Sequence, residues 1–217
     1  MSLAVEVHAD ASAATRRVAS LIAERAREGA GRRGRFTLAV SRGPELIRLI
    51  AAEDIPWQQV VVYQVDERVA PPGHEDRNLT HLLAGVPHDS ARPMPVDDPD
   101  PEDAATRYAG ELPDRLDLVH LGLGPDAHTA SLVPGDPVLD VRDRLVAITA
   151  EYRGYRRMTL TYPALEAARE IVWLVTGESK RDALALLLAG DASIPAARIS
   201  NLHQLVIADE RAAMFGV

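Results

Sequence analysis

The sequence of 217 residues contains no cysteine. This absence excludes disulfide bonds, thiolate nucleophiles and cysteine-based zinc sites. Aromatic residues are also scarce, at 4% of the chain against 47% for all hydrophobic residues, so the core must consist mostly of Ala, Val, Leu and Ile. A hydrophobic fraction of this size is typical of a folded globular protein and not of a disordered chain.

Positive charge is in short supply as well, because the formal net charge is -8. A general nucleic-acid surface needs a basic field that displaces counterions, so we expect no nucleic-acid partner, although a basic pocket remains compatible with this charge. No apolar run approaches the roughly 18 residues of a membrane span, and no basic segment followed by an apolar run begins the chain. We therefore expect a cytoplasmic protein with no membrane contact, active as a monomer or a small homo-oligomer.

Short apolar runs alternate with helical patterns along the chain, and one domain covering residues 1–217 is comfortable at this length. Helices are predicted at 13–28, 44–52, 78–84, 104–112 and 180–188. Strands are predicted at 36–40, 60–65, 116–123, 145–149, 158–161, 171–176 and 206–208. Continuous apolar strands are typical of sheets that are buried on both faces. The sequence therefore predicts an α/β fold, with a largely parallel sheet covered by helices on both faces in a Rossmann-like three-layer sandwich.

Polar, charged or glycine-containing segments come directly after four of the predicted strands. They occupy residues 41–43, 66–68, 122–128 and 177–180. In an open α/β sheet, ligands bind outside the carboxyl ends of the strands. We therefore expect these four segments to meet at one ligand site.

The first and last of these segments have two interpretations each. Ser41, Arg42 and Gly43 lead into a helix, where backbone N–H groups either bind a phosphate or are capped by Ser41. Lys180 either supplies a positive charge to a ligand or is solvated, as most lysines are. The local sequence does not decide between these interpretations.

The second segment contains Asp66, Glu67 and Arg68. An arginine can hold a phosphate through two parallel hydrogen bonds. The alternative is an ion pair among these three side chains at the surface, where charged runs are usually solvated.

The third segment, Gly-Leu-Gly-Pro-Asp-Ala-His at 122–128, is the sharpest signal. Gly122 and Gly124 permit backbone conformations closed to other residues, and Pro125 stiffens the second half of the turn. The turn would present His128 to a ligand, and histidine can take up and return a proton near neutrality. The alternative is a structural histidine that caps the next helix.

Other common sites find no support in the sequence. His74, His81 and His88 recur every seven residues but lack a closely spaced pair, so we expect no metal site. No Gly-x-Gly-x-x-Gly comes after the first apolar strand, and no Gly-x-Ser-x-Gly occurs anywhere. We therefore expect neither a dinucleotide cofactor nor a serine hydrolase.

Taken together and in order, these segments resemble the 6-phosphogluconolactonase family. The resemblance rests on Val-Asp-Glu-Arg-Val-Ala-Pro at 65–71 and on Gly-Pro-Asp-Ala-His-Thr-Ala-Ser-Leu-Val-Pro at 124–134. Supporting matches lie at 76–78, 157–161, 177–180 and 194–196. The resemblance covers most of the chain, and the two motifs are specific as a pair.

The resemblance implies hydrolysis of 6-phosphoglucono-δ-lactone, a phosphorylated sugar lactone of the pentose phosphate pathway, without metal or cofactor. It implies that His128 is the general base and that Asp126 orients the site around it. The remaining residues that it assigns hold the 6-phosphate or shape the substrate site: Ser41, Arg42, Gly43, Asp66, Arg68, Asn78, Arg157 and Lys180.

The chain departs from the family pattern at two positions, and two alternatives stay open. Arg42 replaces a glycine of the usual Ser-Gly-Gly loop, and Ala127 replaces the glycine of Asp-Gly-His. If the backbone of Ala127 has a positive φ, the alanine is strained by about 1–2 kcal/mol. One alternative is an inactive paralogue that binds sugar phosphates. The other is an amino-sugar-phosphate isomerase or deaminase, which would need a carboxylate where Val133 stands.

Overall fold

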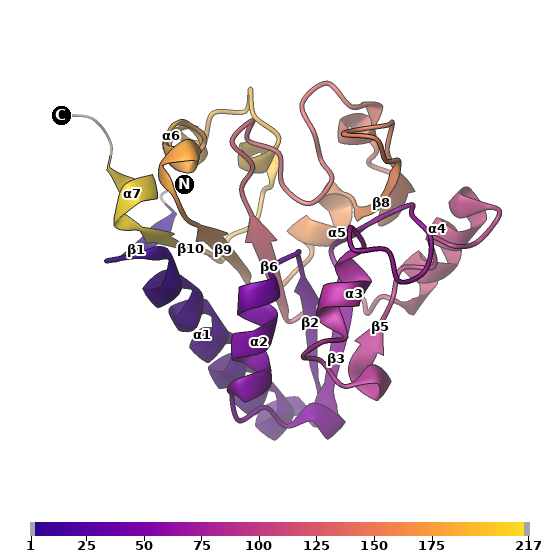
Figure 1. The fold of residues 1–217 in the computed structure, drawn as a ribbon, viewed down its shortest axis with the longest axis horizontal. Coiled ribbons are helices and arrows are strands. Elements are labelled where there is room, and N and C mark those ends of the chain that lie inside the picture. The colour runs from indigo at the N-terminus through magenta and orange to yellow at the C-terminus, as the bar shows by residue number, and fades with distance from the viewer. Residues whose placement is uncertain (1–2, 215–217) are drawn as a thin grey trace.

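A seven-stranded sheet forms the centre of the computed structural model, in which residues 3–214 are described (Figure 1). The strand order is β1-β10-β9-β6-β2-β3-β5, and every neighbouring pair is parallel. The strands are β1 (Ala4–His8), β2 (Phe36–Val40), β3 (Val60–Gln64), β5 (Ala91–Arg92), β6 (Leu118–Gly122), β9 (Ile171–Val175) and β10 (Gln204–Asp209).

Helices cover this sheet on both faces, which confirms the expected three layers (Figure 1). One core cluster joins the sheet to α1 (Ala11–Arg33), α2 (Pro44–Ala52) and α3 (Asn78–Leu82). The other joins its opposite face to α4 (Pro101–Glu111), α5 (Tyr162–Glu166) and α6 (Arg181–Ala189). The remaining elements are α7 (Glu210–Ala213) and 3₁₀ turns at Trp57–Gln59, His88–Ser90, Pro137–Asp140, Glu178–Lys180 and Ala196–Arg198.

A second, three-stranded sheet was not expected. Its strands are β4 (Asp66–Arg68), β8 (Arg157–Leu160) and β7 (Val146–Ile148), paired antiparallel in that order. The sequence predicted strands near β7 and β8 but assigned them to one largely parallel sheet. A short apolar run indicates that a strand is buried, but it does not indicate the direction of its partner.

Helix α1 is longer than the predicted segment 13–28. Asp10 caps its start by accepting a hydrogen bond from the backbone of Ala13 at 2.7 Å, and Gly34 ends it with φ 72°. The predicted helix stops at residue 28, but the residues that follow form the last turns of α1 up to Arg33. A Cβ on Gly29 would lie 2.6 Å from the Phe36 ring, so this glycine lets the helix approach β2 closely.

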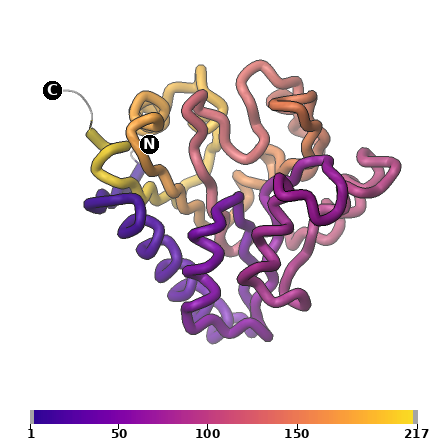
Figure 2. The backbone as a smooth tube through the Cα atoms, in the orientation of Figure 1, coloured from indigo at the N-terminus to yellow at the C-terminus, as the bar shows by residue number. Residues whose placement is uncertain are grey.

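The two outer strands of the main sheet had no signal in the sequence. Strand β1 leaves Val5 and Val7 exposed, and β5 has only two residues, so neither forms a continuous buried run. Within residues 3–214, no helix combines the length and the apolar character needed to cross a membrane. Figure 2 shows the segments near residues 125, 150 and 180 gathered at the top of the molecule.

Candidate active site

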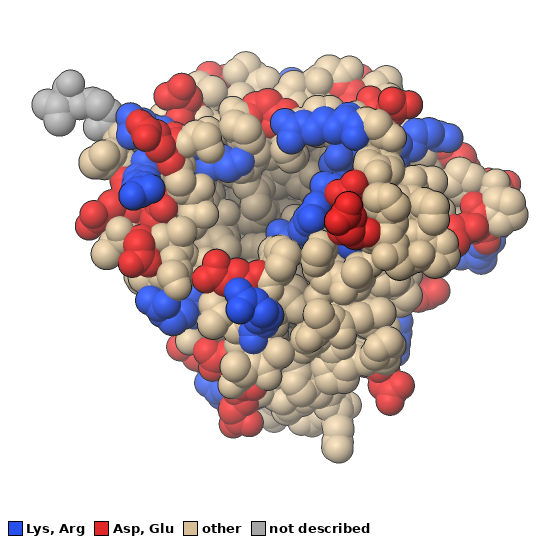
Figure 3. Space-filling view, viewed as in Figure 1, with Lys and Arg blue, Asp and Glu red and all other residues tan. Residues whose placement is uncertain are grey.

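A cleft of about 240 Å³ opens beyond the carboxyl ends of β2, β6 and β9. In Figure 3 the same face is hollowed near its centre, with Lys and Arg atoms along the rim. The fold thus brings the four strand-end segments together, as expected for an open α/β sheet. Eight of the predicted site residues line the cleft: Ser41, Arg42, Asp66, Arg68, Asn78, His128, Arg157 and Lys180.

His128 and Asp126 form a hydrogen-bonded pair on the turn after β6, with 2.5 Å between Nδ1 and Oδ1. Burial opposes ionisation of Asp126, but hydrogen bonds from Tyr152 and His128 outweigh it and lower its pKa to about 2. An ionised carboxylate only accepts hydrogen bonds, so Nδ1 of His128 must carry the proton. The Nε2 atom of the neutral ring is then left as the basic nitrogen.

Gly124 is required by close packing and not by its backbone angles. A Cβ at this position would lie 2.1 Å from Nδ1 of His128 and 2.5 Å from Oδ1 of Asp126. Neither Gly122 nor Gly124 has a positive φ, so the expectation of special backbone conformations at these glycines was wrong. Gly124 also donates a backbone hydrogen bond to the carbonyl of His128 at 2.8 Å, which closes the turn.

The left-handed residue of this turn is Ala127, with φ 61°. Alanine in this region is strained by about 1–2 kcal/mol, as the sequence led us to expect. The side chain is 4% exposed and packs into the core, so burial of the methyl group offsets part of this strain. The turn therefore keeps its shape without the glycine that the family pattern has here.

Asp66 lies on the cleft floor, almost fully buried. Its carboxylate accepts hydrogen bonds from Ser131 Oγ at 2.6 Å and from Asn78 Nδ2 at 3.2 Å. Burial raises the pKa of Asp66. Arg68 instead donates to Asp76, with 3.1 Å between Nη1 and Oδ1. The alternative of a solvated ion pair within 66–68 is therefore wrong.

Glu67, inside the same motif, is fully buried and has a structural role. Its carboxylate accepts hydrogen bonds from the backbone N–H groups of Asn78 at 2.7 Å and Leu79 at 2.8 Å. These bonds satisfy N–H groups that the first turn of α3 leaves unpaired. Glu67 thereby fixes the start of α3 and with it the position of Asn78.

Arg157 and Lys180 supply positive charge on the side of the cleft that contains His128. Arg157 is 5% exposed, its Nη2 donates to the carbonyl of Tyr152 at 3.4 Å, and burial lowers its pKa. Burial also lowers the pKa of Lys180. Arg42 and Arg68 lie near Asp76, whereas no ion pair among residues 3–214 includes Arg157 or Lys180. Asp66 attracts Arg157 and Asp126 attracts Lys180, but neither carboxylate forms an ion pair with these cations, so both remain able to contact an anionic ligand.

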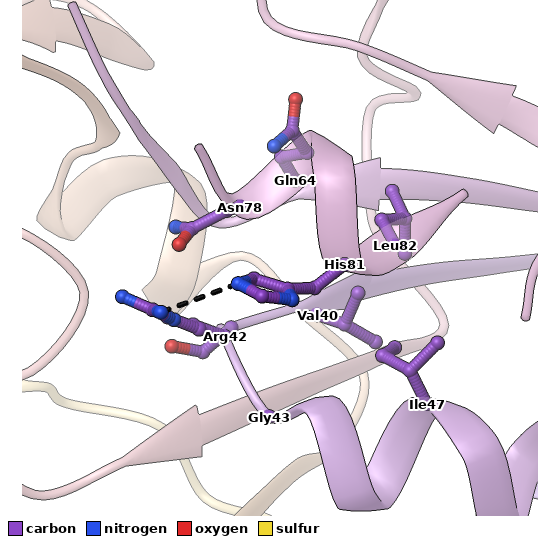
Figure 4. Close-up of a pocket in the computed structure, with 9 residues that line it drawn as sticks. Val40, Arg42, Gly43, Ile47, Gln64, Asn78, His81 and Leu82 are labelled. Atoms are coloured by element: carbon purple, nitrogen blue, oxygen red, sulfur yellow. Dashed lines mark hydrogen bonds between the residues drawn. The ribbon is translucent and has the colours of Figure 1, made fainter. Parts of the chain in front are cut away.

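The loop 41–43 borders a small cavity beside the cleft (Figure 4). Arg42 reaches across it to His81, with 3.2 Å between Nη2 and Nε2. Helix α2 begins after Gly43 without a side-chain cap, so the interpretation of Ser41 as the cap was wrong. The φ of Arg42 is not positive, and the replacement of a family glycine here costs no backbone strain.

Sequence reasoning missed the contribution of the hairpin between β7 and β8. Tyr152 donates to Asp126, Tyr155 donates to Asp76, and Arg153 lines the cleft. The run Tyr-Arg-Gly-Tyr-Arg-Arg at 152–157 is rich in groups that bind anions, which is the one signal that could have found it. No motif identified it, because its place depends on the unexpected second sheet.

Metal ligands do not gather in the described part of the chain. Residues 3–214 contain no cluster of three His, Asp or Glu side chains suited to a metal ion. Of the three histidines with heptad spacing, His81 contacts Arg42 and the carbonyl of Glu75, and His74 contacts the backbone of Asp76.

Comparison with known proteins adds independent support. Residues 9–208 match the sequence model of the family described as glucosamine-6-phosphate isomerases/6-phosphogluconolactonase. A 6-phosphogluconolactonase of Nostoc sp. is 36% identical over 214 residues, 88% of each chain. A 6-phosphogluconolactonase of Rattus norvegicus is 34% identical, over 84% of this chain and 80% of its own.

Solved structures show the same fold at lower identity. A 6-phosphogluconolactonase from Shewanella baltica superposes with a TM-score of 0.83 at 24% identity, over 95% of this chain and 97% of its own. At this identity the likeness concerns the fold alone. The sequence matches are closer and cover nearly the whole chain, and on that basis the protein belongs to the glucosamine-6-phosphate isomerase/6-phosphogluconolactonase family.

Proposed function

We propose that the protein hydrolyses 6-phosphoglucono-δ-lactone to 6-phosphogluconate, with His128 as the general base. The observation that carries this proposal is the Asp126–His128 pair, which lies in one cleft with the cations Arg157 and Lys180. The names of relatives 34–36% identical over most of the chain support the same activity.

In the proposed reaction, His128 takes one proton from water and later gives it to the leaving ring oxygen. Nε2 of His128 takes a proton from water, and the water oxygen attacks the lactone carbonyl to form a tetrahedral intermediate. The bond from the carbonyl carbon to the ring oxygen then breaks, and His128 returns the proton to that oxygen. Asp126 stabilises the imidazolium that exists between the two steps, as a carboxylate does in other histidine pairs.

The cations of the cleft hold the 6-phosphate in this proposal. Lys180 acts as a point charge, and Arg68 and Arg157 offer planar guanidinium groups. Because the phosphate is remote from the reacting carbonyl, these contacts act by positioning that carbonyl beside His128. Asp66 holds Asn78 in place at the floor of the cleft.

The alternative of an amino-sugar-phosphate isomerase needs a second carboxylate after the histidine. Val133 occupies that position and is 7% exposed. The absence of an ionisable group there favours lactone hydrolysis over a ring-opening step that needs a carboxylate. The alternative of an inactive sugar-phosphate-binding paralogue has less support, because the turn that carries His128 is intact around Ala127.

The test measures consumption of 6-phosphoglucono-δ-lactone against its spontaneous hydrolysis. Wild-type protein should accelerate the reaction, and glucono-δ-lactone, which lacks the phosphate, should be a much poorer substrate. Glucosamine 6-phosphate should not react. A wild-type rate no higher than that of His128→Ala would contradict the proposal, whereas tight binding of 6-phosphogluconate without turnover would identify an inactive paralogue.

A further inference from the structure

The hairpin that joins β7 to β8 reaches over the cleft. Tyr152 and Tyr155 face each other as an isolated antiparallel bridge, and the two residues between them, Arg153 and Gly154, have φ values of 51° and 82°. These left-handed angles make a tight tip. The hairpin thus presents two tyrosines from a short, well-defined turn just before β8, and this segment lies in the upper right of Figure 1.

Each tyrosine hydroxyl of this hairpin donates to a different carboxylate of the cleft. The Tyr152 hydroxyl is 2.7 Å from Oδ2 of Asp126, which also accepts from His128 through its other oxygen. The Tyr155 hydroxyl is 3.0 Å from Oδ2 of Asp76, whose other oxygen accepts from Arg68. One hairpin therefore contacts both the histidine pair and the carboxylate that neutralises the arginines.

The contact with Tyr152 has a geometric consequence for Asp126. This carboxylate is 35% exposed, so water could solvate it and its side chain could turn away from the histidine. With Oδ2 bound to the Tyr152 hydroxyl, Oδ1 is held toward Nδ1 of His128. Burial and the bond to Asp126 raise the pKa of Tyr152, so its hydroxyl stays protonated and remains a donor.

We propose that Tyr152 is a positioning residue that acts through Asp126 to hold His128 in the tautomer with the proton on Nδ1. This tautomer leaves Nε2 as the base, so the inference rests on the proposed function for its catalytic meaning. The tautomer itself does not depend on the substrate. It can therefore be measured even if the proposed reaction is wrong.

The substitution Tyr152→Phe isolates the hydroxyl from the rest of the side chain. Its ring lies 5.0 Å from the guanidinium groups of both Arg153 and Arg157, and Phe keeps a ring in that place. The ring also meets the His128 ring edge-to-face at 5.7 Å. The matched control is Tyr155→Phe, which removes the same kind of bond from the same hairpin.

The first measurement is the ¹⁵N NMR spectrum of His128 in the ligand-free protein at a pH where the ring is neutral. Wild type and Tyr155→Phe should show the Nδ1–H tautomer, and Tyr152→Phe should show a mixture of both tautomers. An unchanged tautomer in Tyr152→Phe would overturn the proposal. His128→Ala assigns the signal.

The second measurement separates kcat from KM for the lactone. Tyr152→Phe should lower kcat about tenfold with little change in KM, as expected for loss of one hydrogen bond to a charged group. Tyr155→Phe should change KM and leave kcat within about twofold, because it acts on Asp76 and the arginine side. Equal losses of kcat in the two variants would overturn the assignment to Tyr152.

The two measurements distinguish failure of this inference from failure of the proposed function. If wild-type protein does not hydrolyse the lactone faster than His128→Ala, the proposed function fails. The tautomer in Tyr152→Phe still decides whether the tyrosine positions the pair. If the wild type is active and the tautomer shift is absent, the inference on Tyr152 alone is wrong.

Discussion

Strand β6 and the turn that leaves it carry two histidines in opposite surroundings. His120 lies inside the strand, 2% exposed, and neither ring nitrogen has a hydrogen-bond partner within residues 3–214. Its neighbours across the sheet are Val40 and Val172. His128 lies on the turn, with Asp126 bound to Nδ1 and Nε2 left as the basic nitrogen. The two histidines therefore differ mainly in whether their ring nitrogens have a hydrogen-bond partner.

The comparison shows why only some histidines are useful for proton transfer. Burial without a partner lowers the pKa of His120 to about 4, so the ring stays neutral and uncharged at physiological pH. The carboxylate beside His128 instead fixes its tautomer and can stabilise its charged form. The two histidines are eight residues apart in the sequence, and their surroundings separate the structural one from the catalytic candidate.

The largest expected effect is the contrast in activity between substitutions at the two histidines. His128→Ala should lower kcat for the lactone by about 10²–10⁴-fold, which is typical for loss of a general base. His120→Leu should leave kcat within about twofold, because His120 shares the face of β6 with Leu118, which packs with α1 and α2, and does not line the cleft. Steady-state kinetics of both variants check this, and a comparable loss in His120→Leu would break the comparison.

The next effect is a loss of stability in acid that depends on His120. The pKa of His120 is about 4 in the folded state, below the 6.5 that is usual for histidine, so the unfolded state takes up a proton first as the pH falls. Titration of His120 therefore does not change the unfolding free energy above about pH 6.5. It lowers the unfolding free energy by about 3 kcal/mol as the pH falls toward 4.

Urea unfolding of wild type and His120→Leu between pH 7.5 and 4.5 measures this difference. The free-energy gap in favour of the leucine variant should widen as the pH falls. A gap that stays constant with pH would show that His120 does not titrate on unfolding. It would contradict the claim that burial keeps the His120 ring neutral.

A smaller effect is expected at Gly124, which lets the histidine pair pack against the backbone. Gly124→Ala should lower kcat by about 10- to 100-fold, because the added Cβ must displace the His128 and Asp126 side chains. Gly110→Ala is the control, since a Cβ there meets no atom within 4 Å and Gly110 does not line the cleft. Equal kcat values for the two variants would show that the packing at Gly124 does not position the pair.

The smallest expected effect concerns Ala127. Ala127→Gly relieves strain of about 1–2 kcal/mol but loses a buried methyl worth about 0.8 kcal/mol and adds freedom to the unfolded chain. The net change in unfolding free energy should be a gain of no more than about 1 kcal/mol. Thermal unfolding measures it, and a clear destabilisation would show that the turn has adapted to alanine.

The sequence predicted the parts of the cleft that lie directly after apolar strands. His128, Arg68 and Lys180 each sit just after a buried run, and ligands in such sheets gather at the strand ends. The cleft position of these residues was therefore predictable. Their exact partners were not, because Asp76, which neutralises Arg68, lies in a loop whose path no local pattern determines.

The hairpin with Tyr152 and Tyr155 could not be predicted for a related reason. Its place above the cleft depends on antiparallel pairing of β8 with both β4 and β7, and short apolar strands do not encode the direction of their partners. The sequence also did not show why residue 124 must be glycine. A glycine that makes room for two neighbouring side chains looks the same in sequence as one that needs a special φ.

The parallel order of the main sheet has a practical consequence for handling the protein. All strand-to-helix segments that line the cleft leave the sheet at the carboxyl ends of its strands. The connections at the amino ends of the strands therefore carry no cleft residue. The connections at 34–35, 53–59 and 112–117 lie at these amino ends. A fluorescent label or an affinity tag inserted at one of these places would report on the protein while leaving substrate access open.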